Sequence, residues 1–421
     1  MPYKRFSISD ETIELIQQAE ETIQPLFQGL DFYRQANSLK ILKAMQDARL
    51  SDSHFHWYTG YAYDDPGREV IEKIYASVFD AEDALVRPAI ASGTHAITLM
   101  LSGILRPGDM MLSITGTPYD TLLSVIGTTA KNGSTLIELG ITYGEIQMTP
   151  DGKFQKDLIL EGLALKPKLI YLQRSQGYSF RPTFSLDELA DIVQLIKRES
   201  PDTIIALDNC YGEFTQAYEP TAVGVDILAG SLIKNPGGGL ALSGGYIVGR
   251  KDLIELCSHK LTSPGLGKEV GGTFGFTRQL LQGLFFAPTV VENALKSAIL
   301  TAEVMTRLGY EVFPKVDAER DDIIQAIRLG SREKVIAYCE EVQKASPVDA
   351  FVTPIPWPMP GYDDEVIMAA GTFIQGASIE LSADAPMREP YVVYVQGALL
   401  YEQGKLALMK AVDRLKALDV V

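Results

Sequence analysis

A lysine and an aspartate are the residues of this sequence with the clearest chemical use. Lys234 lies in Ser231-Leu-Ile-Lys234-Asn-Pro-Gly-Gly-Gly239, 26 residues after Asp208, which ends an apolar run that starts at Thr203. A buried lysine amine can condense with an aldehyde, and a carboxylate can keep a ring nitrogen protonated. Pyridoxal phosphate (PLP) chemistry requires these two groups. A lysine before a glycine-rich turn is also common at solvated helix and strand ends, so this pair alone leaves both interpretations open.

Two further segments could hold other parts of such a cofactor. Ser92-Gly93-Thr94 opens an apolar helix, and the free N–H groups of its first turn favour a phosphate, although a plain serine N-cap would explain the same residues. Tyr119 follows an apolar strand at 110–115. Its ring could stack on a pyridine ring at the carboxyl end of that strand, or it could lie in an ordinary turn.

Helical and extended patterns alternate from about residue 66 to residue 250, and the candidate residues follow several of the strands. Such alternation predicts a parallel sheet covered by helices. One helix starts after Ser185, where Glu188 completes a capping box. The other expected helices are 66–79, 94–105 and 121–128, and the expected strands are 110–115, 135–139, 169–173, 203–207, 225–228 and 245–248.

The flanking segments predict a helical arm and a second, smaller α/β unit. The arm covers residues 1–48, the large domain 49–290 and the small domain 291–421, with a helix at 288–308 leading from one to the other. The elements expected in the small domain are helices at 332–345 and 391–418 and short strands near 350–353 and 378–381.

Composition excludes several classes of protein. A net charge of −16 opposes binding to nucleic acid, because phosphate backbones need clustered Lys and Arg. Three widely spaced cysteines without a CxxC motif argue against disulfides and a zinc site, so no metal is expected. No apolar run approaches the roughly 18 residues of a membrane span. We therefore expect a cytoplasmic protein with no membrane and no nucleic-acid partner.

Taken together, the motifs resemble a known family. The sequence is similar to the methionine gamma-lyase-like group often called aluminium resistance proteins, within the PLP-dependent enzymes of cysteine and methionine metabolism. The resemblance implies fold type I, the aspartate aminotransferase fold: a large domain with a mostly parallel seven-stranded sheet sandwiched by helices, plus a smaller α/β C-terminal domain. The matching stretches are 59–68, 92–96, 116–121, 173–178, 208–213, 230–235, 264–269 and 376–384.

This resemblance implies a role for each candidate residue. Lys234 would bond to the aldehyde of the cofactor and later move the α proton of the substrate. Asp208 would pair with the ring nitrogen, and Tyr119 would stack on the ring. The other residues implied around the phosphate are Ser92, Gly93, Thr94 and Ser231.

The resemblance also implies a shared site. Tyr61 and Tyr63 would reach the phosphate of the neighbouring subunit's cofactor, which makes a homodimer, and further a homotetramer, the expected assembly. Better-known relatives have Tyr-x-Arg in this segment, whereas this sequence has Tyr61-Ala-Tyr63. A neutral phenol replaces a guanidinium that could clamp phosphate bidentately. Arg68 or Arg278 could supply the missing charge.

Substrate contacts are expected from three residues. Arg174 and Gln176 are the candidates for the place of an asparagine that lies beside the ring oxygen and the substrate carboxylate in relatives. Arg388, expected at the start of the last helix, is the candidate for binding the α-carboxylate, and an ion pair with Glu389 at the surface is the alternative.

The expected activity is elimination of a sulfur substituent from an amino acid, as in a methionine gamma-lyase or a cystathionine beta-lyase, which gives thiol, 2-oxo acid and ammonia. Two alternatives stay open. One is another PLP-dependent amino acid reaction, such as an aminotransferase or a non-sulfur eliminase, because the fold does not fix the bond that breaks. The other is a non-catalytic PLP-binding stress-response protein.

Overall fold

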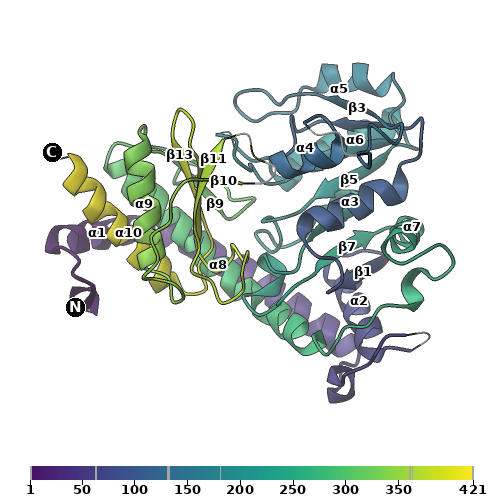
Figure 1. The fold of residues 1–421 in the computed structure, drawn as a ribbon, viewed down its shortest axis with the longest axis horizontal. Helices are drawn as coiled ribbons and strands as arrows, with labels where there is room; N and C mark the ends of the chain where they lie inside the picture. The colour runs from purple at the N-terminus through teal and green to yellow at the C-terminus, as the bar shows by residue number, and fades with distance from the viewer. Residues whose placement is uncertain are drawn as a thin grey trace.

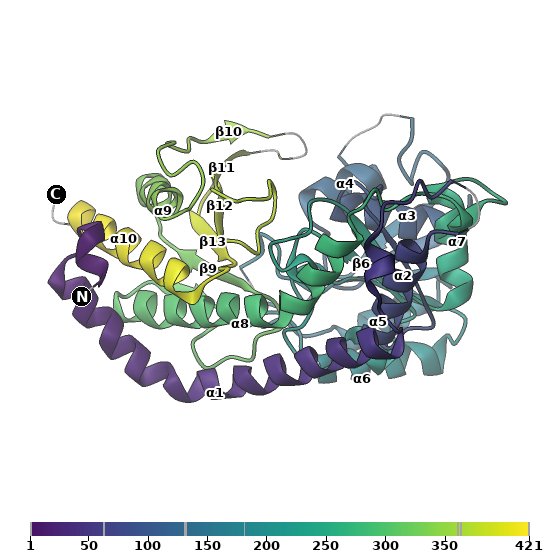
Figure 2. The ribbon, with the colours of Figure 1, turned by 90° about the horizontal axis from the view of Figure 1, so that it is seen from below.

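Two sheets, each with its own helices, are joined by one long helix (Figure 1). The computed structural model describes residues 2–61, 64–129, 133–180, 182–359, 362 and 364–419. Helix α8 (Thr277–Arg307) runs from the large sheet to the small one, and α1 (Asp10–Asp47) lies along it, as the view from below shows (Figure 2). The predicted helical arm is therefore a single helix whose buried residues pack on α8.

The large sheet has seven strands in the described part of the chain, in the order β1-β7-β6-β5-β4-β2-β3. The neighbours from β6 to β3 run parallel, whereas β7 is antiparallel to both β6 and β1. This arrangement confirms the predicted fold class. The strands are β1 (Asp83–Arg87), β2 (Met110–Ser113), β3 (Thr142–Glu145), β4 (Leu169–Gln173), β5 (Ile204–Asp208), β6 (Ile227–Ser231) and β7 (Gly245–Gly249).

Helices cover both faces of this sheet, so its central strands are buried on both sides. On β5, Ile204 and Ala206 pack into one apolar core with α3 and α7, while Ile205 and Leu207 pack into the other with α2, α6 and α8. The helices of this part are α2 (Pro66–Val78), α3 (Gly93–Ile104), α4 (Asp120–Ile126), α5 (Lys156–Leu163), α6 (Leu186–Glu199) and α7 (Lys251–Leu261).

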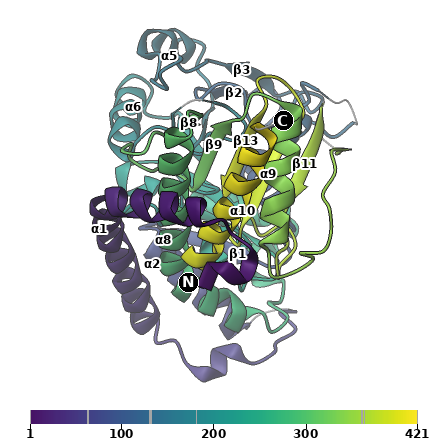
Figure 3. The same cartoon turned by 90° about the vertical axis from the view of Figure 1, so that its left-hand side faces the viewer.

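The small domain is an antiparallel sheet in the order β10-β11-β12-β13-β9-β8. Helices α9 (Arg332–Lys344) and α10 (Tyr401–Asp419) lie over one of its faces (Figure 3). The opposite face contacts aromatic residues of the large domain. The strands are β8 (Glu311–Phe313), β9 (Ile324–Arg328), β10 (Trp357–Pro358), β11 (Glu365–Ala369), β12 (Ser382–Pro386) and β13 (Val392–Gln396).

Several predicted elements were wrong, mostly where apolar runs are short. Residues 135–139 form turns, residues 350–353 and 378–381 form no strand, and the last helix begins at Tyr401 because 392–396 is strand β13. A short apolar run fits a strand or a buried helix equally well, and only its sheet partners decide between them. The predicted domain boundary at 290 falls inside α8, and the boundary at 48 stays a prediction.

Candidate active site

A cavity of about 520 Å³ lies where the large sheet faces the small domain. Its floor is built from residues that follow the carboxyl ends of β2, β4, β5 and β6, and its far wall includes residues of β12 and β13. Ligands of open α/β sheets bind beyond the carboxyl ends of the strands. The cavity therefore lies where the fold favours a ligand, and most of the predicted cofactor residues line it.

Lys234 follows β6 and points into this cavity. Its Nζ lies 3.8 Å from the centroid of the Tyr211 ring, a cation–π contact. Burial works to lower the pKa of the lysine, but the nearby acidic groups of Cys210, Tyr211 and Asp208 outweigh it, so the pKa lies well above its usual range. The amine thus lies between an aromatic face and acidic groups.

Asp208 is the last residue of β5, opposite Gln173 in the parallel ladder with β4. Its side chain is buried, and Oδ1 accepts the backbone N–H of Cys210 at 3.0 Å. Burial raises the pKa of this carboxyl, while the Lys234 charge opposes that rise. A cationic group of a ligand, such as a protonated ring nitrogen, would stabilise the charged form of this buried carboxylate.

The start of α3 forms the other end of the cavity. Ser92 caps this helix by accepting the N–H of His95 at 3.1 Å, and the Thr94 hydroxyl accepts the phenol O–H of Tyr119 at 2.9 Å. The N-terminus of a helix carries free N–H groups and a positive dipole end, which suit an anion. Ser231, at the end of β6, lines the cavity beside them.

Gly93 packs closely against Cys210 and Ser231, so that a side chain at this position would contact both. A Cβ at this position would lie 3.2 Å from Cys210 Sγ and 3.3 Å from Ser231 Cβ. Gly93→Ala should therefore push α3 away from β6 and weaken PLP binding about tenfold, as overpacking of a tight contact does. The dissociation constant of PLP for the apoprotein measures this effect. Gly29→Ala is the control, because a Cβ at Gly29 meets nothing within 4 Å, and equal PLP affinity for both variants would contradict the assignment.

Tyr119 and Gln176 also line the cavity. The Tyr119 N–H donates to Gln173 Oε1 at 3.0 Å, which ties the start of α4 to the end of β4, and burial raises the pKa of its phenol. Gln176 is 1% exposed, and neither its Nε2 nor its Oε1 has a hydrogen-bond partner among the residues that the structure describes. Because buried amides rarely stay unpaired, Gln176 indicates a polar ligand at this wall.

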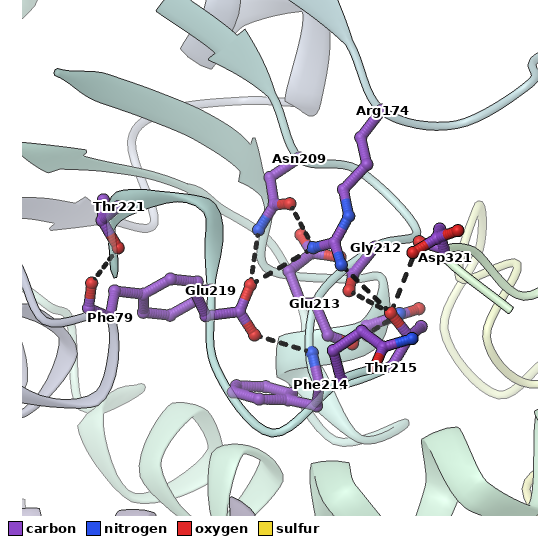
Figure 4. A network of polar contacts seen from close by, with 12 residues as sticks. Phe79, Arg174, Asn209, Gly212, Glu213, Phe214, Thr215, Glu219, Thr221 and Asp321 are labelled. Atoms are coloured by element: carbon purple, nitrogen blue, oxygen red, sulfur yellow. Dashed lines mark hydrogen bonds and ion pairs between the residues drawn. The ribbon is translucent and has the colours of Figure 1, made fainter. Parts of the chain in front are cut away.

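Arg174 does not reach the cavity, so its predicted role in substrate binding has no structural support. Its guanidinium is buried on the other side of β4 and β5, where it donates to Asn209 Oδ1 at 2.9 Å and to Thr215 Oγ1 at 3.3 Å and pairs with Glu219 at 3.5 Å (Figure 4). Asn209 also donates to Glu219 at 3.0 Å. A buried arginine needs such partners, and this one holds the loop after Asp208 in place.

Arg388 lines the cavity, but it lies in the turn between β12 and β13 and not at the start of a helix. Its side chain is about half exposed and pairs with Asp364 at 3.0 Å, so the expected surface pair exists with a partner other than Glu389. Neither Arg68 nor Arg278 lines the cavity: Arg68 donates to the Glu269 carbonyl at 3.2 Å, and Arg278 pairs with Asp52 at 3.5 Å.

Of the two tyrosines expected to serve a neighbouring subunit, the structure describes Tyr61. Tyr61 is 86% exposed and does not line the cavity. Tyr63 lies outside the described residues. In the described part of the chain, Lys234 and Arg388 supply all the lysine and arginine side chains of the cavity.

Sequence reasoning missed the wall formed by the small domain and by the loop after β4. Tyr178, Tyr211, Asp384, Tyr394 and Gln396 all line the cavity. The first three stand inside the quoted motifs, so a signal existed for them. Tyr394 and Gln396 were hidden because their segment was expected to be helical.

Fold and site together define a PLP-dependent enzyme of fold type I, with a lysine and an aspartate at neighbouring strand ends. The family model for methionine gamma-lyase matches residues 12–416, and the chain belongs to that family. PLP is accordingly its cofactor, which supplies an aldehyde for a lysine and a ring that accepts electrons from a substrate. The residues present fit this group, since they include the buried amine, the buried carboxylate, the unpaired Gln176 amide and the Gly93 contact at the helix start.

The chain is also similar to individual curated proteins and solved structures. The chain is 48% identical over 399 residues to the uncharacterized protein YnbB of Bacillus subtilis (strain 168), covering 94% of this chain and 95% of that one. It is 46% identical, with a TM-score of 0.94, to a carbon-sulfur lyase involved in aluminum resistance from Clostridium novyi NT, covering 98% and 97% of the two chains. Cystathionine gamma-lyase from yeast shares the fold at 16% identity, with a TM-score of 0.59 and coverage of 89% and 98%.

Two other features bear on ligands and location. Among the described residues, no three His, Cys, Asp or Glu side chains gather in a way that could hold a metal ion. None of the described helices is long and apolar enough to cross a membrane.

Proposed function

We propose that this protein is a carbon–sulfur lyase that eliminates a sulfur substituent from an amino acid and yields thiol, 2-oxo acid and ammonia. Membership of the methionine gamma-lyase family supports a lyase. The observation that carries the proposal is one cavity that holds both Lys234 and Asp208, at the ends of the adjacent strands β6 and β5. We further propose that the enzyme works in the cytoplasm.

In this proposal each residue has a definite task. Lys234 carries the α proton away from the substrate, and Asp208 keeps the ring nitrogen of the cofactor protonated. Ser92, Gly93, Thr94 and Ser231 bind the phosphate, and Tyr119 stacks on the ring. This division is supported by the helix start at one end of the cavity and the buried carboxylate at the other.

Contacts to the substrate and to a second subunit complete the proposal. Gln176 donates to the ring oxygen or to the substrate carboxylate, and Arg388 binds the α-carboxylate after exchanging its pair with Asp364. Tyr61 and Tyr63 of a partner subunit complete the phosphate site in a homodimer, which pairs further into a homotetramer. The exposure of Tyr61 supports a contribution from outside the chain, and so does the position of Arg68 and Arg278 outside the lining of the cavity.

A substrate panel tests the activity. The purified holoenzyme is incubated separately with methionine, cystathionine, cysteine and alanine, and thiol, 2-oxo acid and ammonia are measured. We expect thiol, 2-oxo acid and ammonia from a sulfur amino acid without any added amino acceptor, and none from alanine. If 2-oxo acid forms only with an acceptor, the protein is an aminotransferase. If no amino acid is turned over while PLP stays bound, it is a non-catalytic binder.

A further inference from the structure

The cavity wall that carries Gln176 is a loop, residues 174–180, and the small domain contacts its backbone at two points. The Gln176 N–H donates to Asp322 Oδ2 at 3.0 Å, and the Tyr394 hydroxyl donates to the Tyr178 carbonyl at 2.6 Å. Asp322 lies just before β9, and Tyr394 lies in the middle of β13. Two side chains of the small sheet thus hold a loop of the large domain.

Asp322 is a buried carboxylate that bonds to both domains. Its Oδ1 accepts the Ile324 N–H at 2.9 Å, which is an Asx turn within the small domain, and its Oδ2 accepts the Gln176 N–H of the large domain. A buried backbone N–H needs an acceptor, because leaving it without one costs free energy. The carboxylate therefore fixes the loop where Gln176 begins its side chain.

The neighbouring residues of the same segment contact the loop that follows β5. The Thr215 Oγ1 atom lies 3.4 Å from the Asp321 carbonyl, in the network of Figure 4, and Gln216 Nε2 donates to the Arg320 carbonyl at 3.2 Å. This segment of the small domain therefore lies against the loops after β4 and β5. Both loops line the cavity, so their positions depend on the position of the small domain.

The side chain of Gln176 is the part of this wall that needs an exact position. It is buried, and both ends of its amide lack a hydrogen-bond partner among the described residues. Since buried amides rarely stay unpaired, the amide is placed for a ligand. Groups that bind a ligand must be held within about 0.5 Å of their working position, and this depends on the residues behind them. Asp322 is the residue behind Gln176.

We propose that Asp322 is a positioning residue, which holds Gln176 in the orientation that binds a ligand at the cavity wall. Asp322 does not line the cavity, so it acts on the ligand through Gln176. Tyr394 supports the same loop through its bond to the Tyr178 carbonyl. The inference rests on the proposed role of Gln176 toward the cofactor or the substrate. It adds that the site is complete only when the small domain lies against the loop.

A double-mutant cycle tests whether Asp322 acts through Gln176. Asp322→Asn keeps the size of the side chain and an oxygen for the Ile324 N–H, and it places an amide N–H₂ against the Gln176 N–H, so two donors face each other. Gln176→Ala removes the amide itself. Two ligands are titrated: PLP into the full-length protein freed of PLP, and alanine into the holoenzyme. The change in visible absorbance gives each dissociation constant.

We expect each single variant to weaken binding about 10-fold in the same titration. The double variant should also lose about 10-fold and not about 100-fold, because Asp322 has nothing to position once the Gln176 amide is gone. Losses that multiply in the double variant would overturn the proposal. Wild-type affinity for both ligands in either single variant would overturn it as well.

The matched control is Asp226→Asn. Asp226 is also a buried carboxylate that accepts a backbone N–H from another element, the Ile205 N–H at 2.7 Å, and it pairs with Lys197 at 2.6 Å. It lies just before β6 and does not line the cavity. This variant should lose thermal stability and keep the wild-type affinity for both ligands. An equal loss of affinity in Asp226→Asn and Asp322→Asn would mean a general structural defect and would overturn the proposal.

Tyr394→Phe gives a second cycle without a change of charge. This matters because burial lowers the pKa of Arg320 to about 10 and the charge of Asp322 opposes that fall, so Asp322→Asn also removes a charge beside a buried arginine. Tyr394→Phe keeps the ring and removes the donor to the Tyr178 carbonyl. We expect an affinity loss of about threefold that disappears in the Gln176→Ala background. A loss that persists there would overturn the proposal.

The titrations separate this inference from the proposed function, because neither requires cleavage of a carbon–sulfur bond. If the cycle shows coupling but no sulfur amino acid releases thiol, the lyase function fails and the positioning role stands. If thiol is released but the losses multiply, the lyase function stands and the positioning role fails.

Discussion

Replacing Lys234 with alanine is expected to abolish both the visible absorbance band of bound PLP and the release of thiol. The variant loses the only lysine amine of the cavity in the described residues, and with it the proposed covalent bond to the cofactor and the proposed base for the α proton. We expect turnover to fall by about 10³-fold or more, since a general base alone contributes about 10²–10⁴-fold. Absorbance spectra and thiol release under substrate saturation measure both effects.

The matched control is Lys260→Ala on α7, which removes an exposed lysine outside the cavity. It should keep the spectrum and the turnover of the wild type. A Lys234→Ala protein that folds, keeps the same absorbance band and retains full turnover would contradict the proposed role of Lys234. The proposed mechanism would then be wrong as well.

Replacing Asp208 with asparagine should produce the second-largest loss. Asparagine keeps an oxygen that can accept the Cys210 N–H, so local geometry is preserved while the negative charge disappears. Removing one partner of a buried charged pair typically costs about 2–5 kcal/mol. We therefore expect kcat/KM to fall by about 30- to 5,000-fold, while PLP stays bound through the proposed bond to Lys234. Steady-state kinetics of thiol release with cofactor content measured in parallel tests this.

A cofactor analogue can distinguish the loss of the Asp208 charge from a structural defect of the Asp208→Asn variant. PLP methylated on its ring nitrogen carries a permanent positive charge, so it should restore part of the lost turnover in Asp208→Asn. A structural defect would not respond to this analogue. If Asp208→Asn is as active as the wild type with ordinary PLP, the aspartate does not act on the ring nitrogen.

Much of the fold could be read from the sequence because its signals are local. The buried strands β4 and β5 are continuous apolar runs with turn residues at their ends, and α6 begins at a serine with a capping-box glutamate. The predictions from short apolar runs failed because the structure of such runs depends on distant partners. Residues 392–396 have a composition that suits a strand or a buried helix, and only pairing with β9 and β12 makes them a strand.

The candidate site also contains residues that local sequence signals could place and a residue that they could not. Asp208, Ser231 and Lys234 follow buried strands in the sequence, and parallel strands bring their carboxyl ends to one edge, so the sequence alone could place them together. Arg174 could not be placed this way. The resemblance made it a candidate for the place of an asparagine in relatives, yet neighbouring residues of an extended segment point to opposite faces, and its partner Glu219 becomes visible only in the folded chain.

The sequence by itself thus determined the amine, the carboxylate and the helix start that we propose bind PLP, since each follows directly from a local element. Only the tertiary structure decided what faces them. The wall of Tyr178, Asp384 and Tyr394 joins a loop of the large domain to two strands of the small one, more than 200 residues apart along the chain. Such contacts depend on how two sheets pack, which no local pattern specifies.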